Sequence, residues 1–252
     1  MARLEYRRID SPSGRETPTL VFLHHGLGSV STWRDFPDRV VELSGLPAVI
    51  YSRYGYGQSA PAPPATRGPD FMHREALDVL PEVLSALAIE QPILVGHSDG
   101  ASIAIIYAAS ELEPRPCGLA LIAPHVIVED RTVAGAAAAR ADFEAGTLRA
   151  RLARHHLDPD GAFRAWDLTW QSAAFRSWNI EDEVSRVCCP MTIVQGLDDE
   201  YGTIDQVERI KRRAMTPPEV LLFSGCGHSP QQDRPDDTLA AIVRLTGMAR
   251  CR

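Results

Sequence analysis

A serine between two glycines, at the junction of an apolar strand and an apolar helix, constrains this chain more than any other feature. The stretch 96–100 reads Gly-His-Ser-Asp-Gly; it follows the apolar run 92–95 and precedes the apolar residues 101–109. The run predicts a buried strand and the later residues predict a helix packed on all sides. In so sharp a turn, side chains at the two glycine positions would collide with the neighbouring strand or helix. We therefore predict an elbow that lifts the Ser98 hydroxyl clear of the sheet, towards the N–H groups of the helix.

Length and composition set broad limits on the function. The chain has 252 residues, 44% hydrophobic and 23% charged, which suits one α/β domain with room for an inserted subdomain. Its net charge of -7 argues against binding to nucleic acid or to anionic membrane surfaces. No apolar stretch approaches membrane-spanning length, and no signal-peptide core is visible. We expect a cytoplasmic monomer or homodimer that acts on a small molecule.

The cysteine and histidine pattern argues against disulfides and metal ions. The five cysteines are odd in number, and Cys188 and Cys189 are adjacent, so we expect reduced thiols rather than a disulfide framework. The sequence contains no C-x-x-C or H-E-x-x-H motif. His24 and His25 are neighbours on a predicted strand and point to opposite faces, so they cannot easily share one ion. We expect no metal and no cofactor.

Short apolar runs alternate with helical patterns along most of the chain. The predicted strands lie at 4–10, 19–24, 48–51, 92–95, 118–123, 191–194 and 220–223. The predicted helices lie at 32–43, 70–87, 101–109, 204–214 and 236–248. We expect a kink in the second helix at Pro81. The continuous apolar strands predict an α/β fold, a mostly parallel twisted sheet with helices on both faces, whose ligands bind beyond the carboxyl ends of the strands.

The alternation stops between residues 125 and 187, where only helical patterns occur. We predict a helical cap at 125–187, inserted into a core formed by 1–124 and 188–252. Three of the four tryptophans fall in this stretch: Trp166, Trp170 and Trp178. Cap aromatics more often form the core of the cap than contact a substrate. Some of them must face the sheet if the cap covers the site, and Trp166 and Trp170 are our candidates.

Two later strand ends carry the groups that a serine nucleophile requires. A serine hydroxyl needs an adjacent base, and the base needs a carboxylate that orients it. The strand at 191–194 leads to Asp198 and Asp199, and the strand at 220–223 leads to His228, which follows two glycines that let its loop bend towards Ser98. Because adjacent side chains diverge, only one of the two aspartates can reach His228.

The order of serine, acid and histidine, with the motifs around them, resembles the α/β-hydrolase family over nearly the whole chain. The resemblance implies a serine hydrolase in which Ser98 attacks a carbonyl and forms an acyl-enzyme that water clears. It also implies that Asp199 is the acid. The elbow offers the backbone N–H of Asp99 to the oxyanion, and the resemblance adds the N–H of Leu27, which follows the His25-Gly26 motif.

Other residues near the expected site are candidates for substrate binding, helix capping or packing. His25 beside the oxyanion loop and His125 at the end of the strand 118–123 are further candidates for substrate binding. The Asp99 side chain lies either at the entrance of the site, where it would favour cationic or hydrogen-bond-donating substrates, or at the start of the helix as a cap. We expect His97 to serve only in packing.

The leading hypothesis is a hydrolase of small-molecule carboxylic esters, including thioesters and lactones. One alternative is a C–C bond hydrolase of the meta-cleavage type, which binds an acidic dienoate; the acidic Asp99 beside the nucleophile argues mildly against it. The other alternative is a hydrolase-fold receptor that binds a ligand with little turnover. A serine at the elbow disfavours dehalogenase and epoxide hydrolase chemistry, which uses an aspartate nucleophile in this fold.

Overall fold

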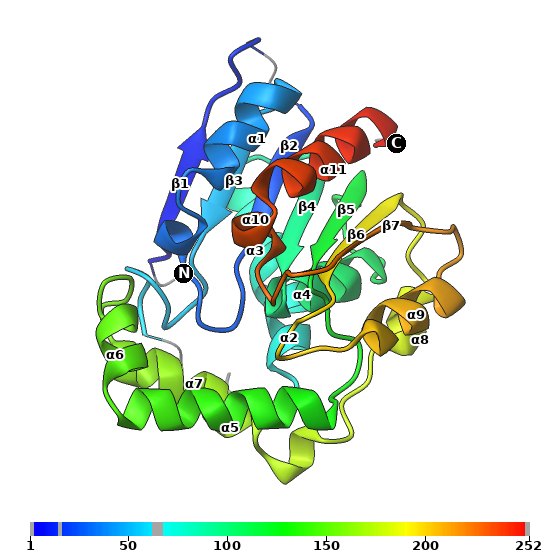
Figure 1. Cartoon of the computed structure of the whole chain (residues 1–252). Coiled ribbons are helices and arrows are strands. Elements are labelled where there is room, and N and C mark those ends of the chain that lie inside the picture. Colours follow the sequence, from blue (N-terminus) through cyan, green and yellow to red (C-terminus); the bar gives the residue numbers. More distant parts are fainter. Residues whose placement is uncertain (1–2, 15–16, 62–67, 250–252) are drawn as a thin grey trace.

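One twisted sheet forms the centre of the molecule (Figure 1). The computed structural model describes residues 3–14, 17–61 and 68–249. Within them, seven strands follow the spatial order β1-β3-β2-β4-β5-β6-β7. Their bounds are β1 (Tyr6–Ile9), β2 (Thr19–Leu23), β3 (Ala48–Tyr51), β4 (Pro92–His97), β5 (Gly118–Ile122), β6 (Met191–Gly196) and β7 (Glu219–Phe223). Only the edge strand β1 runs antiparallel, against β3, and the other described pairs are parallel.

The inner strands are apolar on both faces because helices cover both faces. Every residue of β2, β3, β4, β5 and β6 is buried, whereas the edge strand β7 is only half-buried. Along β2, Val21 and Leu23 belong to one hydrophobic cluster, and Leu20 and Phe22 belong to the other. This alternation places a core on each side of the sheet. The predicted α/β fold with a mostly parallel sheet is confirmed.

Helices that pack on the sheet fall into two layers. The layer on one face holds η1 (Val30–Trp33), α1 (Phe36–Ser44) and α11 (Pro235–Met248), and α10 (Pro230–Asp233) leads into α11. The layer on the other face holds α2 (Phe71–Arg74), η3 (Glu75–Val79), α3 (Leu80–Ala86), α4 (Asp99–Ala108) and α9 (Ile204–Arg213). Helix α4 is buried on all sides, as its uniformly apolar sequence predicts.

Two predicted helices are divided in the structure. The helix predicted at 32–43 is split into η1 and α1 by Arg34, whose φ of 54° and ψ of -129° break the helical path. The helix predicted at 70–87 continues past Pro81, but the irregularity lies in the preceding segment η3, which is a π-helical turn. The wider π-helical turn accommodates the break in the hydrogen-bond pattern that proline causes. Pro81 itself falls in the first turn of α3, where its missing N–H is least costly.

Between β5 and β6 the chain forms a series of helices across the carboxyl ends of the strands (Figure 1). They are α5 (Asp130–Glu144), α6 (Thr147–Leu152), α7 (Pro159–Trp170), η4 (Ala173–Phe175) and α8 (Glu181–Val184). We call α5, α6 and α7 the cap helices. An isolated bridge between Ile127 and Asn179 joins the two ends of this segment. The division into a core and a separate cap domain at 125–187 stays a prediction.

The cysteines differ in one respect from expectation. Cys188, Cys189 and Cys226 are free thiols, but Cys117 is disulfide-bonded. The expectation of wholly reduced cysteines is therefore wrong at Cys117, because the adjacency of one pair constrains nothing at the other positions. In the described part of the chain, no helix has the length and apolar character needed to cross a membrane.

Candidate active site

Ser98 sits at a strained turn between β4 and α4. Its φ of 54° and ψ of -118° lie in a region that costs a non-glycine residue about 1–3 kcal/mol. A Cβ atom on Gly96 would lie 2.3 Å from the carbonyl oxygen of Gly100. A Cβ atom on Gly100 would lie 2.0 Å from the carbonyl oxygen of Leu23. The predicted requirement for glycine at both positions is confirmed, because β2, β4 and α4 approach too closely for any side chain.

The loops after β6 and β7 bring Asp199 to His228. The Nδ1 atom of His228 lies 2.9 Å from Oδ1 and 2.8 Å from Oδ2 of Asp199. Asp198 is exposed, and its backbone N–H donates to the carbonyl of Cys226. A Cβ atom on Gly196 would lie 2.2 Å from the carbonyl oxygen of Gly227, so only glycine there allows the two loops to approach. The structure thus pairs Asp199, and not Asp198, with the histidine.

Several donors hold Asp199 as a buried carboxylate. Oδ2 accepts from Nε2 of Gln195 at 2.8 Å, and Oδ1 accepts from the N–H groups of Tyr201 at 2.7 Å and Gly202 at 3.1 Å. Burial alone would raise the pKa of Asp199. The charge and hydrogen bond of His228 and the N–H of Tyr201 outweigh it and hold the pKa below its usual range. An ionised Asp199 accepts a hydrogen bond from Nδ1–H of His228, which leaves Nε2 as the nitrogen that can take up a proton.

His97, expected to serve only in packing, positions His228 directly. Its Nε2 lies 2.7 Å from the backbone carbonyl of His228, and its Nδ1 lies 3.1 Å from Nε2 of Gln231. Because a carbonyl only accepts, Nε2 of His97 carries the proton. Burial, with the nearby charge of His228, lowers the pKa of His97 to about 3, so the ring is neutral. The packing interpretation was wrong because the contact spans 131 residues of sequence.

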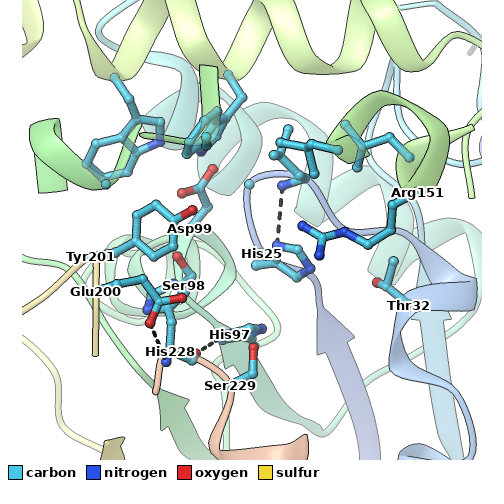
Figure 2. Close-up of a pocket in the computed structure, with 18 of the residues that line it drawn as sticks. His25, Thr32, His97, Ser98, Asp99, Arg151, Glu200, Tyr201, His228 and Ser229 are labelled. Atoms are coloured by element: carbon cyan, nitrogen blue, oxygen red, sulfur yellow. Dashed lines mark hydrogen bonds between the residues drawn. The ribbon is translucent and has the colours of Figure 1, made fainter. Parts of the chain in front are cut away.

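The two backbone N–H groups predicted to bind the oxyanion differ in their hydrogen-bond acceptors. Asp99 is the first residue of α4, and its backbone N–H has no acceptor within the part of the chain that the structure describes. The N–H of Leu27 donates a long hydrogen bond of 3.4 Å to Nδ1 of His25 (Figure 2). The carbonyl of Leu27 accepts from Nε2 of His156 at 3.0 Å, which fixes the peptide plane of this loop.

The Asp99 side chain lines the cavity that Ser98 lines, and it is paired there with a basic residue. It is only 1% exposed, and neither of its carboxylate oxygens has a hydrogen-bond partner among the described residues, so it does not cap α4. Its Oδ2 lies 3.6 Å from Nη2 of Arg53. Burial raises the pKa of Asp99, against the charge of Arg53. Both expectations overlooked Arg53, which draws the carboxylate inward, to a position beside a second cavity of about 140 Å³.

A cavity of about 550 Å³ lies between the sheet edge and the cap helices. It brings together all the predicted site residues except Asp199, which lies behind His228: Ser98, His228, His25, Leu27, Asp99, His125, Trp166 and Trp170. His125 is buried, and its Nδ1 has no hydrogen-bond partner among the described residues. Trp178 is absent from the lining and packs against Phe175. The expectation that a subset of the cap aromatics faces the sheet is confirmed.

Sequence reasoning missed other residues of this cavity. The ring of Tyr201 lies 4.8 Å from the ring of His228, and Oε2 of Glu200 accepts from the backbone N–H of His228 (Figure 2). Both follow Asp199 directly, and that position was the available signal. Arg34 and Arg151 also line the cavity, but no motif marks them. In the described ranges, no group of three or more histidine, cysteine, aspartate or glutamate side chains is arranged to hold a metal ion.

Comparison with known proteins agrees with this fold. The chain belongs to the alpha/beta hydrolase family, whose sequence model matches residues 20–242. It is 27% identical over 256 residues to Esterase Rv0045c of Mycobacterium tuberculosis, a match that covers 92% of this chain and 83% of that protein.

Solved structures share the fold at low sequence identity. The enol-lactonase from Burkholderia xenovorans LB400 has a TM-score of 0.76 and 19% identity, over 97% of this chain and 96% of that one. The esterase EaEST from Exiguobacterium antarcticum has a TM-score of 0.74 and 17% identity, over 98% of this chain and 96% of that one. At these identities the likeness concerns the fold alone.

Proposed function

We propose that this protein hydrolyses small-molecule carboxylic esters, including lactones and thioesters, through an acyl-enzyme on Ser98. The observation that carries the proposal is the pairing of His228 with buried Asp199 at the wall of the cavity that Ser98 lines. The esterase among the sequence relatives supports the same reaction class. Hydrolysis of an ester requires a nucleophile, a base that is also an acid, and donors for the oxyanion.

The first half of the reaction follows from the hydrogen bond between His228 and Asp199. Asp199 stays ionised and accepts a hydrogen bond from Nδ1–H of His228, so Nε2 faces the nucleophile and removes the hydroxyl proton of Ser98 as its oxygen attacks the carbonyl carbon. The resulting imidazolium is stabilised by the carboxylate of Asp199. His228 then gives this proton to the leaving alcohol, and the acyl group stays on Ser98. Water, deprotonated by the same nitrogen, releases the acid.

The negative oxygen of the tetrahedral intermediate needs two donors at one point. We assign these to the backbone N–H groups of Asp99 and Leu27. The N–H of Asp99 has no acceptor in the described structure, and that of Leu27 must leave Nδ1 of His25. Because the bond to His25 is long at 3.4 Å, exchanging it for an oxyanion sacrifices little. His25 is therefore the residue that occupies this donor in the resting protein.

The remaining cavity wall is suited to an apolar body with few polar groups. Trp166 and Trp170 supply aromatic surface from α7, and His125 stands between Trp170 and His228, with ring centroids 5.2 Å and 5.6 Å away. The Asp99–Arg53 pair presents a compensated charge rather than a free anion. We assign substrate contacts to Trp166, Trp170, His125, Asp99 and His25.

The test is hydrolysis of p-nitrophenyl esters of graded acyl length by the wild type and by Ser98→Ala. We expect saturable turnover by the wild type and a fall in kcat of at least 1,000-fold in the variant, because the variant has no nucleophile. A small residual rate should survive from the oxyanion donors and substrate binding. A fluorophosphonate should label the wild type at Ser98 and leave folded Ser98→Ala unlabelled. Equal rates in both proteins would exclude Ser98 as the nucleophile.

Failure of all esters would instead direct attention to the two alternatives. Turnover of a dienoate by the wild type, with none by Ser98→Ala, would indicate the C–C bond hydrolase. A ligand that raises the melting temperature without turnover would indicate the receptor. The compensated charge of Asp99 removes the mild objection to an acidic substrate that the sequence alone raised.

A further inference from the structure

Two arginines of the cavity have no partner among the residues that the structure describes. Arg34 and Arg151 line the same 550 Å³ cavity as Ser98. Within the described residues, neither guanidinium forms an ion pair or a hydrogen bond. Arg140 and Arg149 of the cap helices are paired, with Asp167 and with Asp160 at 2.7 and 2.8 Å, whereas Arg164 of α7 has no ion pair among the described residues. Arg34 and Arg151 differ from Arg164 in that they line the cavity.

The two charges converge although they come from different parts of the fold. Arg34 follows η1 on the sheet side, whereas Arg151 belongs to the cap helix α6. Both act on His155, whose pKa is lowered first by burial and then by the charges of Arg154, Arg34 and Arg151. Figure 2 shows the guanidinium of Arg151 directed over the cavity towards His25, above Thr32. This end of the cavity is cationic, in a chain of net charge -7.

The backbone at Arg34 gives a second, independent observation. Its φ of 54° and ψ of -129° nearly repeat the values of 54° and -118° at Ser98. Glycine would adopt this conformation without strain. The strained position instead carries an arginine that lines the cavity. Strain of this kind gathers where a side chain is held for a ligand.

The acidic groups of the cavity do not neutralise the arginines. Glu200 lies at the catalytic end, where its Oε2 accepts from the backbone N–H of His228 at 3.2 Å. Asp142 of α5 also lines the cavity but forms no ion pair with Arg34 or Arg151. Asp99 is compensated by Arg53. An acidic end near His228 and a cationic end near Arg151 therefore coexist in one cavity (Figure 2).

We propose that Arg34 and Arg151 form an anion-binding subsite, so that the substrate is an ester or lactone that also carries a carboxylate. The inference rests on the proposed function and adds the substrate class. A guanidinium binds a carboxylate through two parallel hydrogen bonds, and a carboxylate held by both arginines would join the cap to the sheet side. The anion lies several bonds from the reacting carbonyl, because Arg151 lies across the cavity from His228 (Figure 2).

The test compares matched anionic and neutral esters. The p-nitrophenyl half-esters of adipic, pimelic and suberic acid are set against p-nitrophenyl hexanoate, heptanoate and octanoate. Shorter half-esters are avoided because their own carboxylate attacks the ester intramolecularly. We expect the wild type to prefer the anionic member of at least one pair by about tenfold or more in kcat/KM. High salt should reduce this ratio, since the arginines are exposed to solvent.

Variants assign the preference to the two arginines. Arg34→Gln and Arg151→Gln should each lower the anionic-to-neutral ratio by about tenfold. Arg154→Gln is the matched control: it makes the same change in net charge one turn from Arg151, but Arg154 does not line the cavity. Its ratio should stay within about twofold of the wild type. A neutral preference in the wild type, or an equal fall in all three variants, overturns the inference.

The outcome separates this inference from the proposed function. Hydrolysis of both ester classes with no dependence on Arg34 or Arg151 overturns the anion subsite and leaves the esterase intact. If no ester is cleaved, the subsite is tested by thermal shift with glutarate and with inorganic phosphate. A shift present in the wild type and lost in the double variant supports the subsite and identifies which anion it accepts; no shift with either overturns it.

Discussion

The Nε2–H group of His97 donates a hydrogen bond of 2.7 Å to the backbone carbonyl of His228. The residue immediately before Ser98 therefore holds the backbone of the candidate base, and one strand, β4, sets the position of both. Gln231 fixes the other nitrogen of His97 at 3.1 Å. Because the carbonyl constrains only the backbone, the imidazole of His228 keeps its own freedom to exchange protons.

Replacing His97 should therefore affect the rate more than binding. His97→Phe keeps the ring volume but removes both hydrogen bonds and leaves the carbonyl of His228 without its donor. We expect kcat for a p-nitrophenyl ester to fall about tenfold, a barrier increase of about 1.4 kcal/mol, with KM changed less than twofold. Gln231→Leu removes only the second bond and should have a smaller effect. Full kcat in His97→Phe would show that β4 alone positions the base.

Buried neutral histidines should make the protein sensitive to mild acid. Burial lowers the pKa values of five of them: His24, His25, His97, His125 and His156. In the unfolded chain each binds a proton near pH 6.5. Between pH 6.5 and the folded pKa, about 3 for His97 and His125, the unfolded state holds more protons. Stability is therefore fully present above pH 6.5 and is lost as the pH falls, by up to about 1.4 kcal/mol per pH unit for each histidine.

Urea unfolding at pH 5, 6, 7 and 8 measures this slope. We expect nearly constant stability from pH 7 to 8 and a steep decline below pH 6.5. His97→Phe removes one titrating group. The free energy of unfolding of this variant should therefore fall less steeply with decreasing pH, by the contribution of about one bound proton. Stability independent of pH from 5 to 8 would contradict the neutral, buried state of these rings.

The elbow should tolerate no side chain at Gly100. A Cβ atom there would lie 2.0 Å from the carbonyl oxygen of Leu23 in the neighbouring strand. We expect Gly100→Ala to destabilise the fold by about 3 kcal/mol or more, or to prevent folding, because backbone atoms on both sides must move. Gly247→Ala in α11 is the control, since nothing lies within 4 Å of its added Cβ. It should stabilise by up to about 1 kcal/mol. Equal melting temperatures of the two variants would contradict the packing argument.

Local patterns were sufficient for the sheet and for the elbow. Continuous apolar runs predicted strands such as β4. The glycines around Ser98 predicted a close approach of backbone segments, and the structure has this approach between β2, β4 and α4. The choice between Asp198 and Asp199 could not be made from the residues themselves, because both lie on the same loop and only its path decides which reaches His228. The resemblance to a family supplied that choice.

Contacts between distant segments were beyond sequence reasoning. The hydrogen bond from His97 crosses 131 residues, and Arg34 and Arg151 line one cavity although they are far apart in the sequence. Asp99 looked like an open acidic group because nothing in its own segment revealed Arg53. In each case the local sequence gave the residue type, and the tertiary fold decided its partner.

His156 joins the cap to the loop that carries the Leu27 N–H. Its Nδ1 accepts from the N–H of Gly57 at 2.8 Å, which leaves Nε2 protonated to donate to the carbonyl of Leu27 at 3.0 Å. The next residue, Leu157, donates its N–H to the carbonyl of Gly57 at 2.9 Å. One imidazole therefore holds together the cap, the loop after β3 and the loop after β2.

His156→Phe should weaken both stability and catalysis. The N–H of Gly57 and the carbonyl of Leu27 would lose their partners in a buried position, which costs about 1–3 kcal/mol for each group. A loosened Leu27 peptide would also place its N–H less well for the oxyanion, so we expect kcat to fall about tenfold or more. His73→Phe is the control, because within the described ranges the His73 ring makes a single hydrogen bond, a long one of 3.5 Å with Glu183. Urea unfolding and ester kinetics measure the two effects. A His156→Phe protein that is less stable but keeps full kcat would show that the Leu27 loop holds its shape without the cap.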